Sequence, residues 1–240
     1  MGALTDEKLG AYANEHFAAS FQKVGTFKIV DGNKQGGNVA TYFCAPDGRV
    51  LHCVAGPVDG PTLLAEAKWV VETVKSISKE SGGDGAKFKV AFRKAHAAKL
   101  KNETGLVVDV QTWDAPDPDD KAALTYKDPT GASLAPKLPP PPIDGPDVSL
   151  MDAEFSAKQE KANSAPGARM VTCGVGGGRR KVVVNNQAVV EQLLAAHALV
   201  PIEKIYGTVF ENVLGEKVST KPVDVVTPFP WVDRAGNKAK

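Results

Sequence analysis

The stretch TYFCAPDGRVLHCVAGPVD, residues 41–59, decides the fold prediction. Two apolar, β-branched runs flank the tetrapeptide APDG, in which Pro46 suits the second position of a β-turn and Gly48 can adopt a positive φ. This pattern predicts a β-hairpin. The two strands carry Cys44 and Cys53, two of the three cysteines in the chain, so the turn geometry decides whether their sulfur atoms can meet.

Two turn geometries are open, and neither favours a disulfide. A three-residue loop closed by Ala45 and Arg49 pairs Cys53 with Thr41 and places the two sulfur atoms on opposite faces of the hairpin. A two-residue turn places them on one face, diagonally, with the Cα atoms about 7–8 Å apart. A disulfide needs Cα atoms within about 7 Å and converging Cβ vectors. We interpret both cysteines as reduced, apolar residues packed in the hairpin.

The segments around the hairpin predict alternating helices and strands. A helix capped by Thr5 and a strand over residues 26–30 precede a polar, glycine-bearing loop. After the hairpin, an apolar stripe at helical spacing predicts a long helix that begins at Asp59 or Gly60 and ends at the GGDG sequence. A more basic helix over residues 87–101, with Phe88, Phe92 and Ala95 on its inner face, then leads into a strand over residues 106–113.

The composition changes sharply after residue 113. Residues 114–149 are rich in Pro, Asp and Gly and include four consecutive prolines at 139–142, which favour extended polyproline II structure. We expect a linker or an arm laid along a surface. It separates an N-terminal unit, residues 1–113, from a C-terminal unit, residues 150–240. The fold class expected is therefore α/β (α+β).

The C-terminal unit predicts a small α/β arrangement. A polar helix over residues 150–163 uses Phe155 as an inward residue, and strands over 170–173 and 181–184 flank a glycine-rich loop. A helix capped by Asn185 or Asn186 and a second one between Pro201 and Gly215 form a helical hairpin. The extended tail carries Phe229 and Trp231, aromatic residues that we expect to dock on the body.

The sequence VATYFCAPDGRVLHCVAG, followed by TLLAEAKWVV, resembles the C-terminal half of a thioredoxin-like domain in the order and length of its elements. The resemblance covers residues 4–74 and implies the last hairpin and the terminal helix of that fold. The chain has no C-x-x-C motif, and no proline lies between Thr26 and Ala45, where the family carries a cis-proline. The resemblance therefore does not imply oxidoreductase activity, because the thiol that a helix N-terminus would activate is missing.

Two groups of residues are candidate sites. Cys44, Cys53 and Cys173 are the candidate thiols of an atypical redox protein. The glycine-rich sequence GVGGGRR, residues 174–180, matches no phosphate-binding fingerprint, and the alternative to a plain hairpin loop is an anion-binding nest. The candidate residues of that nest are Gly176, Gly177, Gly178, Arg179, Arg180 and Lys181.

No metal site or cofactor is predicted. His52 and Cys53 are adjacent on a strand and point to opposite faces. His16, His96 and His197 fall in separate helical segments without ligand spacing. Two ligands from one hairpin fall short of the four that zinc usually takes.

The net charge, apolar content and cysteine number limit the classes of function that we expect. The net charge of +1 gives no long-range attraction to nucleic acid or anionic lipid, and the 42% apolar content suits a globular core. No apolar run is long enough to cross a membrane, and the few cysteines favour a reducing, cytoplasmic setting. We expect a non-catalytic thioredoxin-like protein that acts as a protein–protein interaction or scaffold module. The alternatives are an atypical thiol-dependent redox protein and an anion or nucleotide binder through residues 174–181.

Overall fold

The computed structural model describes residues 3–25, 27–30, 33–35, 37–108, 124–127, 133–137, 143, 145–146, 153–175, 178–218 and 224–226. Most of the predicted linker, its four prolines, and the aromatic tail residues Phe229 and Trp231 lie outside this part of the chain, as do Gly176 and Gly177.

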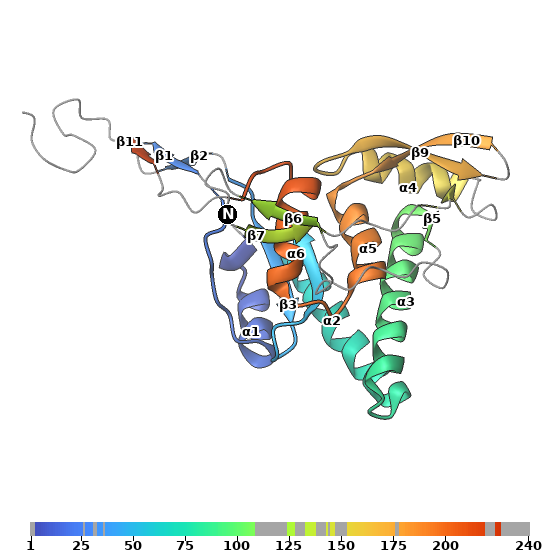
Figure 1. Cartoon of the computed structure of the whole chain (residues 1–240), viewed down its shortest axis with the longest axis horizontal. Coiled ribbons are helices and arrows are strands. Elements are labelled where there is room, and N and C mark those ends of the chain that lie inside the picture. Colours follow the sequence, from blue (N-terminus) through green and yellow to red (C-terminus); the bar gives the residue numbers. More distant parts are fainter. Residues whose placement is uncertain are drawn as a thin grey trace, which may run out of the picture.

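The described residues form a mixed α/β fold, which confirms the predicted fold class (Figure 1). A 3₁₀ turn (Ala3–Thr5) precedes the first α-helix, and a π-helical turn (Val209–Val213) continues the last one. The α-helices are α1 (Glu7–His16), α2 (Gly60–Ser81), α3 (Gly85–Thr104), α4 (Ala153–Asn163), α5 (Asn186–His197) and α6 (Ile202–Thr208).

The strands pair in small sheets of two or three members. In the three-stranded sheet, β1 (Lys28–Val30) lies between β11 (Asp224–Val226) and β2 (Asn33–Gln35), and β2 occupies part of the segment that the sequence predicted as a loop. The antiparallel pairs are β3 (Ala40–Cys44) with β4 (Val50–Ala55), β5 (Leu106–Val107) with β8 (Gly145–Pro146), β6 (Leu124–Lys127) with β7 (Ser133–Lys137), and β9 (Arg169–Val175) with β10 (Gly178–Val184).

The predicted hairpin is present, and its register combines features of both expected turns. The amide of Gly48 donates to the carbonyl of Ala45, and Gly48 has φ 82°, as the APDG pattern predicts. Cys44 pairs with Val50, but a bulge between Phe43 and Cys44 then shifts the register. Cys53 therefore lies opposite Tyr42. The three-residue loop alone would have placed it opposite Thr41.

Helix boundaries follow the capping residues in the sequence. Asp59 caps α2 by accepting from the amide of Thr62, and Gly82 ends that helix with φ 57°. Asn185 caps α5, as expected. The predicted cap of the first helix was wrong: Asp6 accepts from the amide of Leu9, while Thr5 belongs to the 3₁₀ turn. An ionised carboxylate is the stronger acceptor at a positive helix end.

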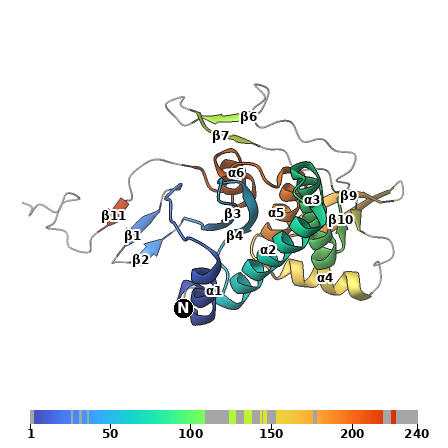
Figure 2. The same ribbon diagram turned by 90° about the horizontal axis from the view of Figure 1, so that it is seen from below.

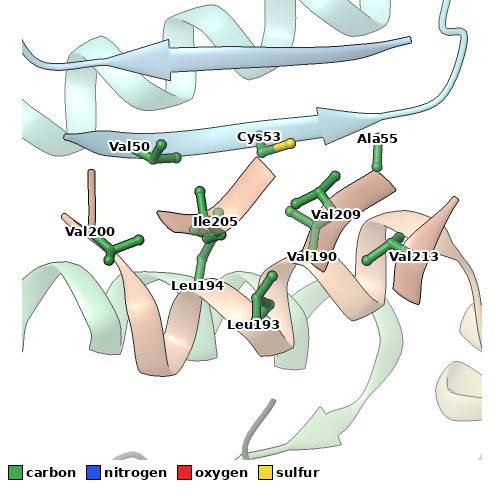
Figure 3. Packing of buried hydrophobic residues seen from close by; sticks show 10 residues of the cluster. All are labelled: Val50, Cys53, Ala55, Val190, Leu193, Leu194, Val200, Ile205, Val209 and Val213. Carbon is green, nitrogen blue, oxygen red and sulfur yellow. The ribbon is translucent and has the colours of Figure 1, made fainter. Parts of the chain in front are cut away.

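The β3–β4 hairpin lies between two helical layers (Figures 1 and 2). One face of β4 packs on α5, α6 and the π-helical turn, and Figure 3 shows Val50, Cys53 and Ala55 pointing toward them. On the other face, Leu51 and Val54 belong to a second cluster with buried residues of α1, α2 and α3. A third cluster joins the C-terminal end of α3 to α4, α5 and the β9–β10 hairpin.

These clusters mix residues from both sides of the predicted linker. Residues 50–55 share one buried cluster with residues 190–213, so the two halves of the chain depend on each other for burial. The domain boundaries at 113 and 149 stay a prediction, as does the thioredoxin-like assignment of residues 4–74. None of the helices in the described ranges combines the length and apolar character that a membrane span requires.

Candidate functional site

The three candidate thiols are free and lie in two separate places. The bulge brings Cys44 and Cys53 to the same buried cluster, while Cys173 on β9 packs in the cluster around α4. Burial raises the pKa of all three thiols, and most strongly that of Cys53, which has no solvent exposure. A redox-active cysteine needs the opposite shift, toward a stabilised thiolate.

The thiol chemistry gives a first prediction. In the native protein at pH 8, Ellman's reagent should modify each cysteine more slowly than it modifies a free thiol, because a raised pKa lowers the fraction of thiolate, and Cys53 should react at least about tenfold more slowly. Cys44, which is half-buried, should react first. Full reaction of three thiols after unfolding in urea is the control. A fast phase in the native protein would restore the redox alternative.

The glycine-rich candidates do not form the expected loop where the structure describes them. Residues 178–181 belong to β10, in which Arg179 pairs with Gly174 and Arg180 with Cys173. Side chains alternate between faces along a strand, so the two arginines diverge, and the Arg180 guanidinium lies 5.9 Å from the centre of the Phe155 ring. The hairpin predicted around the glycine-rich sequence is confirmed as β9 and β10. Strand β10 includes residues 178–181 of the candidate anion-binding stretch.

Three buried polar residues meet between the hairpin and the helices. His52 on β4, His96 on α3 and Glu191 on α5 have no solvent exposure. One ligand atom from each of them lies within 4.8 Å of the other two. We call these three residues the buried His–Glu cluster. No local spacing in the sequence marks this cluster, because its members come from three elements that are far apart in the chain.

The surrounding elements fix the two histidine rings. His52 lies opposite Phe43 in the hairpin, and His96 follows Phe92 by one turn on the buried face of α3. The indole of Trp69 on α2 lies 5.0 Å from the His52 ring and 5.1 Å from the His96 ring, and the two imidazoles stack with centroids 5.6 Å apart. The aromatic packing holds both rings in defined orientations.

Hydrogen bonds define which nitrogen of His96 faces the carboxylate. Nε2 lies 2.8 Å from the backbone carbonyl oxygen of Leu51, which can only accept, so Nε2 carries a hydrogen. Nδ1 lies 2.6 Å from Glu191 Oε2. The other carboxylate oxygen, Oε1, accepts from the side-chain amide of Gln187. Glu191 is therefore held from two sides.

His52 has the complementary arrangement. Its Nε2 lies 3.0 Å from Glu66 Oε2 and donates to that carboxylate. Its Nδ1 is buried, lies 3.7 Å from Glu191 Oε1 and has no hydrogen-bond partner. A buried polar atom without a partner is uncommon and costs free energy. In both histidines, then, Nε2 is occupied and Nδ1 faces Glu191.

Charges extend outward from the cluster. Lys99 on α3 bonds to Glu66 at 3.1 Å and also to Glu103. Burial would raise the pKa of Glu191, but positive charge on the two imidazoles and on Lys99 lowers it overall to about 2. Burial likewise opposes ionisation of Glu66, whose pKa is nevertheless lowered by His52 and Lys99. The site therefore favours the ionised, carboxylate form of both Glu191 and Glu66.

The donor set is one that metal ions use. Two imidazole nitrogens and a carboxylate are typical ligands of zinc and related divalent cations. Metal-binding histidines usually donate their remaining N–H to a carboxylate or a backbone carbonyl, which is what Glu66 and the Leu51 carbonyl provide. The other described residues bury all three side chains completely.

Comparison of the chain with protein-family models, with curated proteins and with solved structures finds no match.

Proposed function

We propose that this chain is a non-catalytic metal-binding protein, in which His52, His96 and Glu191 hold one divalent cation of the zinc class. The observation that carries the proposal is the convergence of two Nδ1 atoms on one buried carboxylate, with Nδ1 of His52 lacking any hydrogen-bond partner. Each ring has its other nitrogen bonded to an acceptor. Once deprotonated, the two Nδ1 atoms would direct their lone pairs toward Glu191, where a cation would lie.

Protonation of both rings is the alternative way to satisfy these atoms. A proton on Nδ1 of His96 would bond well to Glu191 at 2.6 Å, but a proton on Nδ1 of His52 would lie too far from Glu191 Oε1, across 3.7 Å, for a good hydrogen bond. Two positive rings would also stack at 5.6 Å without solvent. A single divalent ion held by His52, His96 and Glu191 would replace these protons and remove this repulsion.

The choice of metal follows from the ligand atoms. Calcium and magnesium prefer sites built from oxygen atoms, whereas imidazole nitrogens favour zinc and its transition-metal neighbours. Glu191 would supply its carboxylate as the third protein ligand. The ion would crosslink β4, α3 and α5. It would thereby stabilise the packing of the β3–β4 hairpin against α5, which follows the predicted linker in the sequence. A structural role of this kind fits a non-catalytic protein; the thioredoxin-like scaffold role stays a prediction.

The proposal predicts one tightly bound zinc ion per chain. After removal of metal with a chelator, titration with Zn²⁺ against a chromophoric competitor should give a stoichiometry of one, and zinc at about 100 times its Kd should raise the free energy of unfolding by about 2.7 kcal/mol. His96→Ala should lose the binding, since it removes a ligand.

Two observations would contradict this proposal. One is a wild-type protein that takes up no zinc in the titration. The other is a His96→Ala variant that folds, by circular dichroism, and still binds one zinc ion with unchanged affinity. The matched control is His16→Ala, because His16 ends α1 outside the cluster and should bind like wild type.

A further inference from the structure

The β9–β10 hairpin is a two-stranded sheet that lies at one end of the described structure (Figure 1). Val182 and Val184 are buried in the cluster that includes residues of α4 and α5, so the residues that alternate with them, Arg179 and Lys181, point to the opposite face. Both of these side chains are exposed, as is Met170 on β9. The outer face of the hairpin, as far as the structure describes it, is open to solvent.

The backbone of β10 has one edge that β9 does not use. Residues of an antiparallel strand alternate between bonding to the partner strand and pointing away from it. Val183 points away, because its amide donates to Gln159 Oε1 at 2.6 Å and its carbonyl accepts from Gln159 Nε2 at 3.3 Å. The backbone groups of Lys181 and Arg179 therefore point to the same edge. Within the described ranges, no other residue bonds to them there.

Gln159 on α4 shows what this edge accepts. Its side-chain amide offers one acceptor and one donor to Val183, the same two groups that a residue of a neighbouring strand would offer. The amide covers a single residue, whereas the open edge continues through Lys181 to Arg179. An added strand would continue the pairing there with its own backbone, which is how extended peptides bind to exposed sheet edges.

Charge determines which strand can pair with this edge. The two strands of the hairpin contain no acidic residue, and their basic residues are Arg169, Arg179, Arg180 and Lys181. Arg180 lies on the inner face, over the Phe155 ring. A second copy of the same edge would bring like charges together, which opposes pairing. A strand with carboxylates at alternate positions would instead place them beside Arg179 and Lys181.

We propose that the open edge of β10 is a docking site for an extended acidic segment of a partner protein, with carboxylates two residues apart that contact Arg179 and Lys181. Backbone hydrogen bonds to the edge supply affinity, and the two cations select an acidic sequence. This site is separate from the buried His–Glu cluster, and it does not depend on metal binding.

The first test titrates the full chain into a short fluorescent peptide of alternating valine and glutamate and follows its anisotropy. Valine favours the extended conformation. The variant Arg179→Glu/Lys181→Glu reverses both charges and should weaken binding at least about tenfold, since like charges then face each other. The matched control is Lys75→Glu/Lys79→Glu, which makes the same change of charge on exposed residues of α2 and should bind like wild type.

The second test compares Lys181→Pro with Lys181→Ala. Both variants lose the charge, but only proline removes the outward-pointing amide. Proline is tolerated at an edge position whose N–H faces away from the partner strand, so the β9–β10 pairing should be kept. We expect Lys181→Pro to bind the peptide about tenfold more weakly than Lys181→Ala, through the lost hydrogen bond and the bulk of the ring. Circular dichroism checks that both variants fold.

Several outcomes would overturn the proposal. Equal binding by the two Lys181 variants would mean that charge alone holds the peptide. A wild-type chain that does not bind the peptide, or a charge reversal at Arg179 and Lys181 that leaves affinity unchanged, would also exclude it. Equally tight binding of a single-stranded oligothymidylate would indicate a nucleic-acid surface. Self-association of the wild type that Lys181→Pro abolishes would assign the edge to a second copy of the chain.

Discussion

Replacing Glu191 by alanine is expected to lower the free energy of unfolding by about 3–5 kcal/mol, the range for removing one partner of a buried ionic pair. The change leaves His52 and His96 facing a cavity without a counter-charge, and it deprives Gln187 of an acceptor. Urea unfolding measured with chelator present isolates this effect from metal binding. With saturating zinc, the difference between the two proteins should widen, because only the wild type gains the binding energy.

The control for this variant is Glu160→Ala, since Glu160 is exposed on α4 and its loss should alter stability by no more than about 0.5 kcal/mol. A destabilisation of the Glu191→Ala variant no larger than that of the control would show that the cluster carries no buried charge.

The same carboxylate sets a pH dependence. The pKa of Glu191 is lowered from its ordinary value of 4.5 to about 2, as burial is outweighed by the positive charges beside it. A group whose pKa is depressed in the folded state contributes its full stabilisation above the unfolded pKa and loses it as the pH falls toward the folded one. The stability difference between wild type and Glu191→Ala should therefore shrink between pH 4.5 and 2. A constant difference would contradict the assignment.

Replacing Leu194 by alanine is expected to cost about 2–5 kcal/mol, the usual range for a buried leucine truncated in a close-packed core. Leu194 has no solvent exposure and packs in the cluster shared by β4, α5 and α6 (Figure 3). The effect measures how far the hairpin depends on helices that follow the predicted linker. Urea unfolding of the full chain should remain a single transition, because both halves contribute to this cluster.

Leu4→Ala is the matched control, since Leu4 is 86% exposed, and we expect a change within about 0.5 kcal/mol. Two separate unfolding transitions, with Leu194→Ala shifting only one of them, would show that the two halves fold independently and that the shared cluster contributes little.

Local chemistry made much of the fold predictable. The APDG turn, the Asp59 cap, Gly82 and Asn185 each specify a backbone geometry from a few neighbouring residues, and the structure has the hairpin and helices at those places. The bulge was not predictable in the same way. The APDG turn alone specifies a single pairing register for the two strands. The two faces of β4 pack against different clusters, and this tertiary packing favours the shifted register beyond the bulge.

The buried His–Glu cluster depends on contacts that no local pattern encodes. His96 and Glu191 lie 95 positions apart in the chain and meet only after α3 and α5 pack together. A signal was nevertheless present: each is a polar residue among the buried residues of a helix, most of which are apolar. Charged residues are almost never fully buried without a partner, so these two positions could have been marked as members of a polar site.

The most direct test of the metal centre is anomalous X-ray diffraction at the zinc absorption edge from crystals of the zinc-loaded protein. We expect one strong peak enclosed by His52, His96 and Glu191, about 2.0–2.2 Å from Nδ1 of each histidine and from the carboxylate. A zinc-loaded crystal without a peak at this position, or with its peaks confined to cysteines and surface histidines, would contradict the account.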